Sequence, residues 1–328
     1  MNKTYILIIK KDDFDFKEIL GIPLLYYHFL RARNQNSSLF LVTEDQKYID
    51  FFNNCKLEKE ISDNCYITLS NCFEKDVKFN LTKKEALKII ESKEIKEKEF
   101  IIRTNKDFYS FRNIVKEYIN FKFIEKGVDI ENISTTYIGP EVNIEKGTKI
   151  TGDTHIYGKS CIGKNNLISS SYIENTNIKD DNKILNSHIV GAMIGCKNEI
   201  GPFCRMRGKA VIDNECVLGN FVEIKSSNIK DHVKIKHLSY IGDTFIEKNV
   251  NIGCGFVTAN YDGKRKYPTT IEENVFVGCN TTIVSPVTLK ENCFIAAGSV
   301  ITKDVEKNDL AIARSRQINK TNYVKQKK

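Results

Sequence analysis

The second half of the chain carries hydrophobic residues, mostly isoleucine, at a regular interval of six positions. The series begins at Ile138 and runs, with a few five-residue steps, to Ile252; after a polar interruption it continues from Ile271 to Ile301. A helix buries residues about every 3.6 positions and a half-buried strand every second position, so neither explains a step of six. The pattern predicts a triangular parallel β-helix of about nine coils, each built from three hexapeptides.

In such a coil, one aliphatic side chain per hexapeptide points inward and stacks on its equivalent in the next coil. Burial of each isoleucine contributes roughly 1.5 to 3 kcal/mol, so these ladders are the main expected source of stability. An inward charge would be strongly destabilising. Glycines directly after ladder residues, such as Gly139, Gly163 and Gly278, suit crowded corners.

Residues 1 to about 105 lack this repeat. Short apolar runs predict buried strands over 5–9 and 39–42, with a helix over 19–33 between them, which indicates a small α/β layer. A charged helix with a solvated outer face is expected over 83–98. A connecting helix is expected over 107–126, ending at Gly127, and its packing stripe holds Phe111, Val115, Tyr118, Ile119 and Phe123.

The expected organisation is therefore an α/β head followed by an all-β part. We predict a head over residues 1–105, a connector helix over 106–128, a β-helix over 129–323 and a basic tail over 324–328.

Composition narrows the cellular setting. Hydrophobic residues make up 41% of the chain and charged residues 28%, which excludes wholesale disorder. No apolar run is long enough for a membrane span or signal peptide, so neither is expected. The ten cysteines include no C-x-x-C pair, and positions such as Cys161 and Cys293 are interpreted as small apolar sites with reduced thiols. We therefore predict a cytoplasmic protein.

The formal net charge is +8, with basic and acidic residues interleaved along the chain. A positive excess suits phosphorylated ligands. A nucleic-acid-binding surface would gather its bases on one stripe, so nucleic acid and membrane are not expected as partners.

Seven segments of the repeat region resemble one known family in wording, order and spacing. They are IGPFCRMRGKA, LGNFVEIK, IKHLSYIGD, NVNIGCGFVTANYDGKRKYPTTI, NVFVGCNTTIVSPV, IAAGSVITKDV and LAIARSRQ. They closely resemble the acetyltransferase domain of the bifunctional N-acetylglucosamine-1-phosphate uridyltransferase family, also called glucosamine-1-phosphate N-acetyltransferase. The resemblance covers about residues 130–323, and HLSYIGD followed by NYDGKRK is its most specific part. It implies a left-handed β-helix, acetyl-CoA as the donor and a homotrimer.

The head resembles the family's pyrophosphorylase domain much less. The phrase GIPLLYYHFLRA is similar to its start, but KKDDFDFKEI stands where the family has a glycine-rich, arginine-containing nucleotide loop. Glycines let backbone N–H groups approach phosphates, whereas aspartates would repel a triphosphate. The head is also about half the family's length. We therefore predict a shortened, degenerate head without uridyltransferase activity.

Acetyl transfer to an amine needs a base and a well-held donor carbonyl. His237 in KHLSY matches the family's catalytic histidine, and an imidazole can accept the proton that the attacking amine loses. Glu223 is expected to orient the amine or the imidazole. The resemblance thus implies glucosamine 1-phosphate as the acceptor and N-acetylglucosamine 1-phosphate as the product.

Five further residues match the family's contacts to the sugar phosphate. Arg207, Lys225 and Lys266 match phosphate-contacting positions, where long cationic side chains offset the charge. Tyr240 and Asn251 match the pair that contacts the sugar, and a phenol and an amide are groups that hold hydroxyls.

The polar segment over residues 258–270 interrupts the ladder and is predicted to form a loop over a groove. Positions that match the family's acetyl-CoA contacts are Cys254, Asn260, Tyr261, Cys279, Ala297 and Arg314. Cys279 replaces the family's serine and is a weaker hydrogen-bond partner. A nucleophilic role for Cys279 is the less favoured interpretation, because transfer in the family is direct.

Three alternatives stay open. Some left-handed β-helix proteins are zinc carbonic anhydrases with three histidines, but the spacing of His155, His188, His232 and His237 lacks that pattern, and no metal is expected. A second alternative is a different acceptor, for example an amino sugar linked to a nucleotide. The third is a non-catalytic trimeric scaffold, although stability alone would not require the matched polar residues.

Overall fold

The computed structural model describes residues 4–8, 18–19, 22–23, 38–42 and 105–324. The predicted helix over 83–98 lies outside these residues, as do most of the segment KKDDFDFKEI and all of the tail except Val324. The chain divides into two compact units, residues 1–115 and 116–328.

Two strand pairs are described in the first unit. β1 (Thr4–Ile8) pairs in parallel with β4 (Ser38–Val42), which confirms the two predicted strands to within one residue. β2 (Glu18–Ile19) and β3 (Ile22–Pro23) form an antiparallel pair. The prediction of a helix beginning at Ile19 is therefore wrong at residues 19, 22 and 23, which lie in short antiparallel strands; residues 24–33 of that predicted helix lie outside the described residues.

Helix α5 (Asn105–Glu125) precedes the β-helix. Its residues Ile119 and Phe123 are buried, as predicted, because residues four apart share a helix face. Tyr118 was expected in the same stripe but is 59% exposed, with Lys122 Nζ 4.5 Å from its ring centroid. The helix ends at Glu125, and Gly127 follows with a φ of +88°, a conformation that glycine adopts after helix ends without steric cost.

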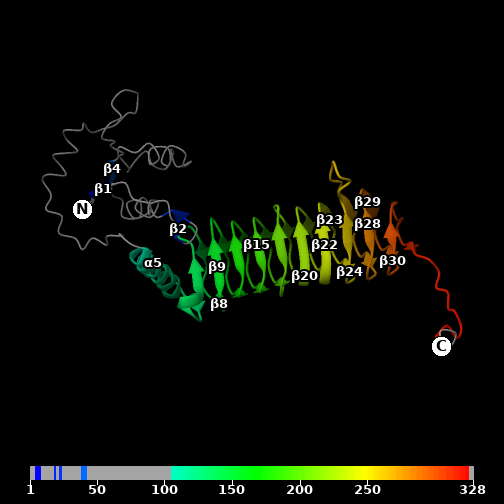
Figure 1. Cartoon of the computed structure of the whole chain (residues 1–328), viewed down its shortest axis with the longest axis horizontal. Coiled ribbons are helices and arrows are strands. Elements are labelled where there is room, and N and C mark those ends of the chain that lie inside the picture. The colour runs from blue at the N-terminus through cyan, green and yellow to red at the C-terminus, as the bar shows by residue number, and fades with distance from the viewer. Residues whose placement is uncertain (1–3, 9–17, 20–21, 24–37, 43–104, 325–328) are drawn as a thin grey trace, which may run out of the picture. The chain divides into compact units, whose positions relative to one another are not determined.

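The rest of the described chain is a parallel β-helix with three sides per coil, whose strands stack in chain order (Figure 1). The first side contains β5 (Asp129–Ile130), β8 (Lys149–Thr151), β11 (Leu167–Ser169), β14 (Lys183–Leu185), β17 (Glu199–Ile200), the starts of β20 (Val217–Lys225) and β22 (Lys234–Gly242), β24 (Asn251–Ile252), β27 (Phe276–Val277), β30 (Phe294–Ile295) and β32 (Leu310–Ala311).

A short 3-10 helix, η1 (Ile133–Thr135), leads to the second side. That side contains β6 (Thr136–Ile138), β9 (Thr154–Tyr157), β12 (Tyr172–Glu174), β15 (His188–Val190), β18 (Arg205–Arg207), the ends of β20 and β22, β25 (Val257–Ala259), β28 (Thr282–Val284) and β31 (Val300–Ile301). The third side contains β7 (Asn143–Ile144), β10 (Cys161–Ile162), β13 (Asn177–Ile178), β16 (Met193–Ile194), β19 (Val211–Ile212), β21 (Asn228–Ile229), β23 (Thr244–Ile246), β26 (Thr269–Ile271) and β29 (Val287–Leu289).

The aliphatic ladders form the core. Ile162 pairs with Ile144 below and Ile178 above, and all three are at most 2% exposed. This in-register stacking confirms the predicted parallel β-helix, which fits the left-handed form expected from the resemblance. The coils extend beyond the predicted nine to about 11 turns, because strands also form at Asp129–Ile130 and Leu310–Ala311, outside the run of ladder residues that defined the period.

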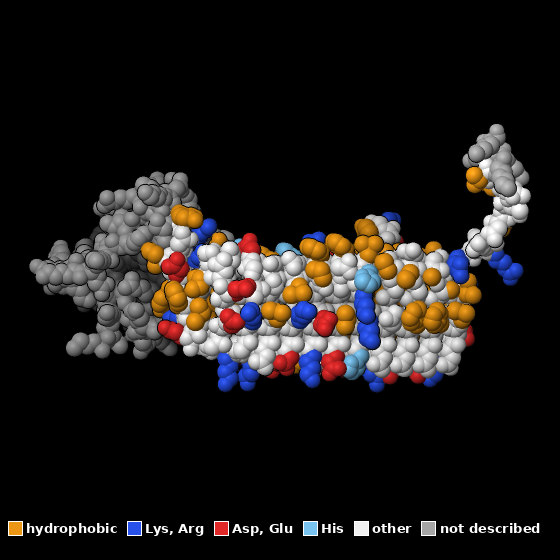
Figure 2. Space-filling view, turned by 90° about the horizontal axis from the view of Figure 1, so that it is seen from below, with side chains coloured by type: hydrophobic (Ala, Val, Ile, Leu, Met, Phe, Trp, Pro, Cys, Tyr) orange, Lys and Arg blue, Asp and Glu red, His pale blue; other side chains and the backbone are white. Residues whose placement is uncertain are grey.

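Side chains next to a ladder residue point outward, because neighbouring positions in a strand face opposite sides. Cys161 precedes ladder residue Ile162 and is exposed, so its interpretation as a small apolar site is wrong. Cys293 is 1% exposed, as expected. Figure 2 shows a face of the β-helix where charges of both signs are interspersed with hydrophobic side chains. Among the described residues, no helix is both long and apolar enough to be a candidate membrane span.

Candidate active site

The second side changes character where β18, β20 and β22 run in register. Outward positions there align Arg205 with Glu223 and Tyr240. Two residues further along the same strands, Arg207 aligns with Lys225, and Lys225 with Gly242. The register thus brings three predicted substrate contacts onto one face, since the repeat places equivalent positions of successive coils above one another.

Arg207 and Glu223 form a two-pronged ion pair. Arg207 Nε donates to Glu223 Oε1 at 2.8 Å, and Arg207 Nη2 lies 2.7 Å from the same oxygen. Charge-assisted contacts of this kind fix the geometry of both groups. Glu223, which was expected to orient the amine or the imidazole, pairs with Arg207, one of the predicted phosphate ligands.

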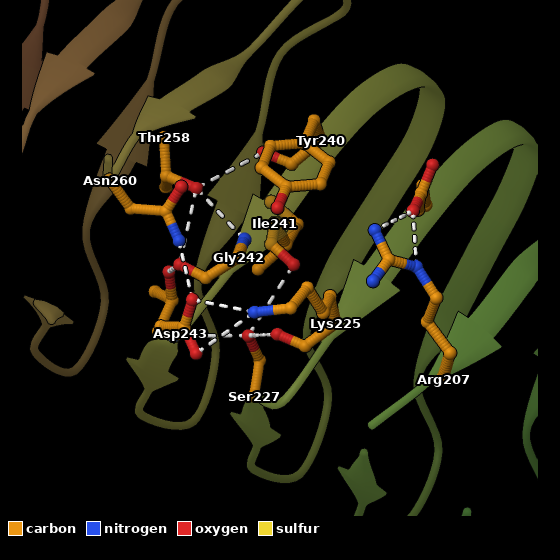
Figure 3. A network of polar contacts seen from close by, with 11 residues as sticks. Arg207, Lys225, Ser227, Tyr240, Ile241, Gly242, Asp243, Thr258 and Asn260 are labelled. Carbon is orange, nitrogen blue, oxygen red and sulfur yellow. Dashed lines mark hydrogen bonds and ion pairs between the residues drawn. The ribbon is translucent and has the colours of Figure 1, made fainter. Parts of the chain in front are cut away.

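Lys225 is held by Asp243, the last residue of the HLSYIGD segment. Lys225 Nζ donates to Asp243 Oδ2 at 2.9 Å and to Oδ1 at 3.2 Å. Asn260 Nδ2 donates to the same Oδ2 at 2.6 Å. Figure 3 shows the carboxylate between these two side chains, with the ring of Tyr240 close by. Asp243 therefore links the second side to the loop that follows β25.

Lys266 belongs to that loop and faces Lys225. A hydrogen bond with Lys225 lowers the pKa of Lys266 below the usual lysine value, because the Lys225 ammonium donates to the neutral amine of Lys266; charge repulsion between the two groups adds to the shift. The same contact and the hydrogen bond to Asp243 raise the pKa of Lys225. Arg207 also contributes to the lowered pKa of Lys266. Arg207 and Lys225 are neighbours in register, and Lys266 contacts Lys225. These three residues form a positive cluster in which Glu223 and Asp243 already pair with two of the cations, and the remaining positive charge suits a phosphate group.

His237 lies at the corner between the first and second sides, within β22. Its Nδ1 is 2.7 Å from Asn220 Oδ1, in the coil below. A carboxamide oxygen only accepts, so this contact requires a proton on Nδ1, and in the neutral imidazole the lone pair is then on Nε2. The imidazole is exposed. This tautomer is the one that a base acting through Nε2 requires.

Four predicted donor contacts continue the corner above His237. The register places Cys254, Cys279 and Ala297 at equivalent positions of successive coils. Cys279 and Ala297 are exposed. A Cβ added to Gly298 would lie 3.7 Å from Arg314 Cδ, so this arginine passes over the end of the corner. Small side chains along an open corner, with a cation at its end, fit a long thioester that carries phosphates.

A loop lies between β25 and β26, as predicted, but it spans residues 260–268, because residues 258–259 and 269–270 of the predicted segment belong to the two strands. Thr258 aligns with ladder residue Ile283 and is 1% exposed. A threonine therefore replaces an aliphatic residue in the ladder, just before the loop begins. Asn260 is 6% exposed, whereas Tyr261 is 61% exposed. The backbone of Tyr261 forms an isolated antiparallel β-bridge with that of Lys266. Asp262 also holds the loop together. Its pKa is lowered by hydrogen bonds from the backbone N–H groups of Arg265 and Lys264 and from the Tyr267 hydroxyl.

Asn251 lies apart from the other substrate contacts. It belongs to β24 on the first side and aligns with Lys234 and Phe276. Tyr240 is on the second side. The two sides of one coil face different directions, so the predicted sugar-contacting pair is divided between them.

Sequence reasoning missed Asn220, Asp243 and Thr258. All three lie in the family-like segments, but their roles depend on which coil positions stack. The described residues contain no cluster of three or more metal-binding side chains. Three of the histidines weighed as zinc ligands have other contacts: His155 is near Asp153, His188 stacks on Tyr172, and His232 is near Glu215.

Comparison with known proteins agrees with this geometry. Residues 268–303 match the bacterial transferase hexapeptide family, six repeats. Over 213 residues the chain is 42% identical to the bifunctional protein GlmU of an Exiguobacterium species, covering 65% of this chain and 47% of that protein. For GlmU of a Geobacillus species the identity is 45% over 212 residues, covering 64% and 46%.

The C-terminal part of this chain is homologous to GlmU. A third relative, GlmU of Staphylococcus haemolyticus, is 41% identical over 212 residues, covering 64% of this chain and 47% of that protein. The matched part therefore spans less than half of each GlmU relative. It fits the acetyltransferase domain of that family, as the seven segments predicted.

Solved structures give weaker matches. A UDP-N-acetylglucosamine acyltransferase from Bacteroides fragilis has a TM-score of 0.37 and 16% identity, covering 53% of this chain and 70% of that chain. The LpxA structure from Acinetobacter baumannii has a TM-score of 0.34 and 20% identity, covering 54% and 68%. At these values the likeness carries no argument about function.

Proposed function

We propose that this protein transfers the acetyl group of acetyl-CoA to the amine of glucosamine 1-phosphate and releases N-acetylglucosamine 1-phosphate. The observation that carries the proposal is that the positive cluster and a histidine whose Nδ1 pairs with Asn220 lie in adjacent coils. Arg207, Lys225 and Lys266 supply the cluster, and His237 supplies the base. Homology to GlmU supports the same assignment.

The positive cluster binds the phosphate of the acceptor. Arg207 is pre-oriented by Glu223, and Lys225 by Asp243, so little side-chain entropy is lost when the phosphate binds. Tyr240 lies beside Lys225 and offers a hydroxyl to the sugar. Holding the phosphate fixes the distance from the amine to the corner that carries His237.

His237 Nε2 accepts the proton that the amine loses as its nitrogen attacks the thioester carbonyl. The new C–N bond forms, the C–S bond breaks, and the thiolate of coenzyme A leaves. The proton on His237 Nδ1 stays there throughout, donated to Asn220 Oδ1. This hydrogen bond stabilises the imidazolium that forms. The backbone N–H of Cys254 is the proposed donor to the developing oxyanion.

We propose that the donor extends along the corner past Cys279 and Ala297 toward Arg314. Its thioester end then lies near His237 and its phosphates near the Arg314 guanidinium. Asn260 and Tyr261 approach it from the loop. Acetyl-CoA supplies the activated acetyl group, and no metal is part of the proposed reaction.

We also propose a homotrimer. The division of Tyr240 and Asn251 between two sides of the coil supports it, because a neighbouring copy can supply the missing side chain to one acceptor. Light scattering tests this directly: a mass three times that of the chain is expected, and a monomer that is fully active would contradict it.

The acceptor is tested by release of free coenzyme A from acetyl-CoA with a panel of amines. The panel contains glucosamine 1-phosphate, glucosamine 6-phosphate, glucosamine and a nucleotide-linked amino sugar. We expect the highest kcat/KM for glucosamine 1-phosphate. Preference for the nucleotide-linked sugar would change the acceptor, and no release with any amine would favour a scaffold.

The proposal includes no uridyltransferase activity, since the segment KKDDFDFKEI has aspartates where the resembled family has its glycine-rich nucleotide loop, and aspartates repel a triphosphate. Incubation with UTP and N-acetylglucosamine 1-phosphate is expected to release no pyrophosphate. Formation of UDP-N-acetylglucosamine by the pure protein would contradict this part of the proposal.

A further inference from the structure

Asp243 occupies a position between two parts of the site that the proposed function assigns to different substrates. Its Oδ2 accepts from Lys225 Nζ at 2.9 Å and from Asn260 Nδ2 at 2.6 Å. Lys225 belongs to the phosphate-binding cluster, and Asn260 begins the loop proposed to contact the donor. A single carboxylate oxygen therefore joins both parts (Figure 3).

The backbone around Asp243 leaves it little freedom. Its N–H donates to the carbonyl of Lys225 at 2.9 Å, and its carbonyl accepts from Thr269 N–H at 3.3 Å. Its φ is +50°, a left-handed conformation that aspartate and asparagine tolerate better than most residues. The carboxylate thus projects from a fixed corner.

The surrounding packing is also close. A Cβ added to Gly242 would lie 2.6 Å from the Tyr240 hydroxyl and 2.8 Å from Asn260 Nδ2. Asn260 is 6% exposed, and only 13% of the Lys225 side chain is exposed. A shift of Lys225 or Asn260 must therefore be accommodated by its shared partner, since no open space separates them.

The charge arrangement connects this contact to ligand binding. Lys225 is paired with Asp243 and also contacts Lys266 of the loop. A phosphate that binds between the two lysines shares Lys225 with Asp243, so the carboxylate interacts more strongly with Asn260. The arrangement of the loop then depends on whether the acceptor is present.

We infer that Asp243 is a positioning residue that couples acceptor binding to donor binding by holding Lys225 and Asn260 in one arrangement. The inference rests on the proposed function for the identity of the two ligands. Coupling between sites is reciprocal, so each ligand raises the affinity for the other by the same factor.

The test uses the full chain and isothermal titration calorimetry with coenzyme A, which cannot react, in the absence and presence of saturating glucosamine 1-phosphate. For the wild type we expect the acceptor to lower the Kd for coenzyme A at least about fivefold. Asp243→Asn keeps the left-handed corner but removes the charge, and it is expected to reduce this factor to about one.

Asp213→Asn is the matched control. Asp213 Oδ2 accepts from Lys230 Nζ at 3.0 Å across successive coils on the third side, so this variant removes a similar ion pair away from the site and is expected to keep the wild-type factor. Asn260→Ala removes the contact with Asp243 and also a proposed donor contact, so only the ratio of its Kd values with and without glucosamine 1-phosphate is compared. If Asp243 acts through Asn260, the double variant shows no lower factor than either single variant.

A factor of about one in the wild type, or an unchanged factor in Asp243→Asn, would overturn the coupling. Failure of the proposed function gives a different result, namely that neither ligand binds the wild type. Hydrogen exchange of the free protein then decides the positioning role by itself. Asp243→Asn should speed exchange in residues 258–268 and Asp213→Asn should not; equal exchange in all three proteins would overturn the role of Asp243.

Discussion

Two stretches of the second side use the same backbone for different purposes. In the early coils, outward rings stack on one another: Tyr137 lies 4.5 Å from His155, and Tyr172 lies 4.6 Å from His188, centroid to centroid. In the coils of the candidate site, the same column continues as Arg205, Glu223 and Tyr240.

The difference shows that the inward ladders and outward columns are independent. Ile189 and Ile224 are both 0% exposed, and they stack in the same way beneath the two stretches. On the outer surface of the early coils, aromatic rings stack on one another. In the later coils, Arg207 and Lys225 pair with carboxylates beside the loop. The coil provides spacing, and the outward residues provide the chemistry.

The largest expected effect comes from removing the base. His237→Ala should lower kcat for acetyl transfer about 10²- to 10⁴-fold, since that is the usual contribution of a general base. The rate is followed by release of coenzyme A from acetyl-CoA with glucosamine 1-phosphate. His188→Ala, in the early column, is the control and should retain wild-type kcat; near wild-type turnover by His237→Ala would refute the assignment.

The ladder is tested by Ile189→Ala, which leaves a cavity under the ring stack. Truncation of a buried isoleucine costs about 2 to 5 kcal/mol, so we expect a clear fall in the urea midpoint of unfolding. Activity at low temperature should remain, because the site lies in later coils. Loss of activity without loss of stability would show that the two stretches are not independent.

A smaller effect is expected from the pH dependence of acceptor binding. The lowered pKa of Lys266 means that this residue loses its charge at lower pH than an ordinary lysine, whereas the raised pKa of Lys225 keeps that residue charged. Phosphate affinity should therefore be greatest below the Lys266 pKa and fall as the pH rises through it.

Lys266→Ala should bind the acceptor more weakly at neutral pH and with a flatter alkaline profile. Titrations of glucosamine 1-phosphate over a pH series measure both features. An alkaline fall that persists unchanged in Lys266→Ala would assign it to another group.

The smallest effect concerns Cys279, which stands where the family has serine. A hydroxyl is a better hydrogen-bond partner than a thiol, so Cys279→Ser should tighten coenzyme A binding by no more than about tenfold, the value of one neutral hydrogen bond. Cys161→Ser, at another exposed thiol, is the matched control. Equal Kd values for both variants and the wild type would remove Cys279 from the donor site.

Much of the fold followed from the sequence because the six-residue period is a direct signature of a β-helix. The ladder residues, the loop between β25 and β26 and the end of α5 just before Gly127 were all predicted. The helix over 19–33 failed at its start because a two-residue hairpin is a local alternative that apolar content alone does not distinguish. The prediction that Tyr118 belongs to the packed stripe of α5 was wrong, because helical spacing does not show how wide the buried stripe is.

The candidate site was predicted by residue type but not by pairing. The sequence indicated His237, Lys225 and Asn260, but it did not indicate their partners Asn220 and Asp243. Each pairing joins residues 17 or 18 positions apart in successive coils. A coil of varying length does not fix that register until the chain is folded, so the sequence alone leaves the partners open.

The account is tested most directly by one matched pair in the same outward column. The rate of N-acetylglucosamine 1-phosphate formation from acetyl-CoA is measured for the wild type, Tyr240→Ala and Tyr172→Ala. We predict at least about a tenfold loss of kcat/KM for Tyr240→Ala, equivalent to about 1.4 kcal/mol, and less than about a twofold change for Tyr172→Ala. Equal rates for the two variants would contradict the placement of the chemistry in the later coils.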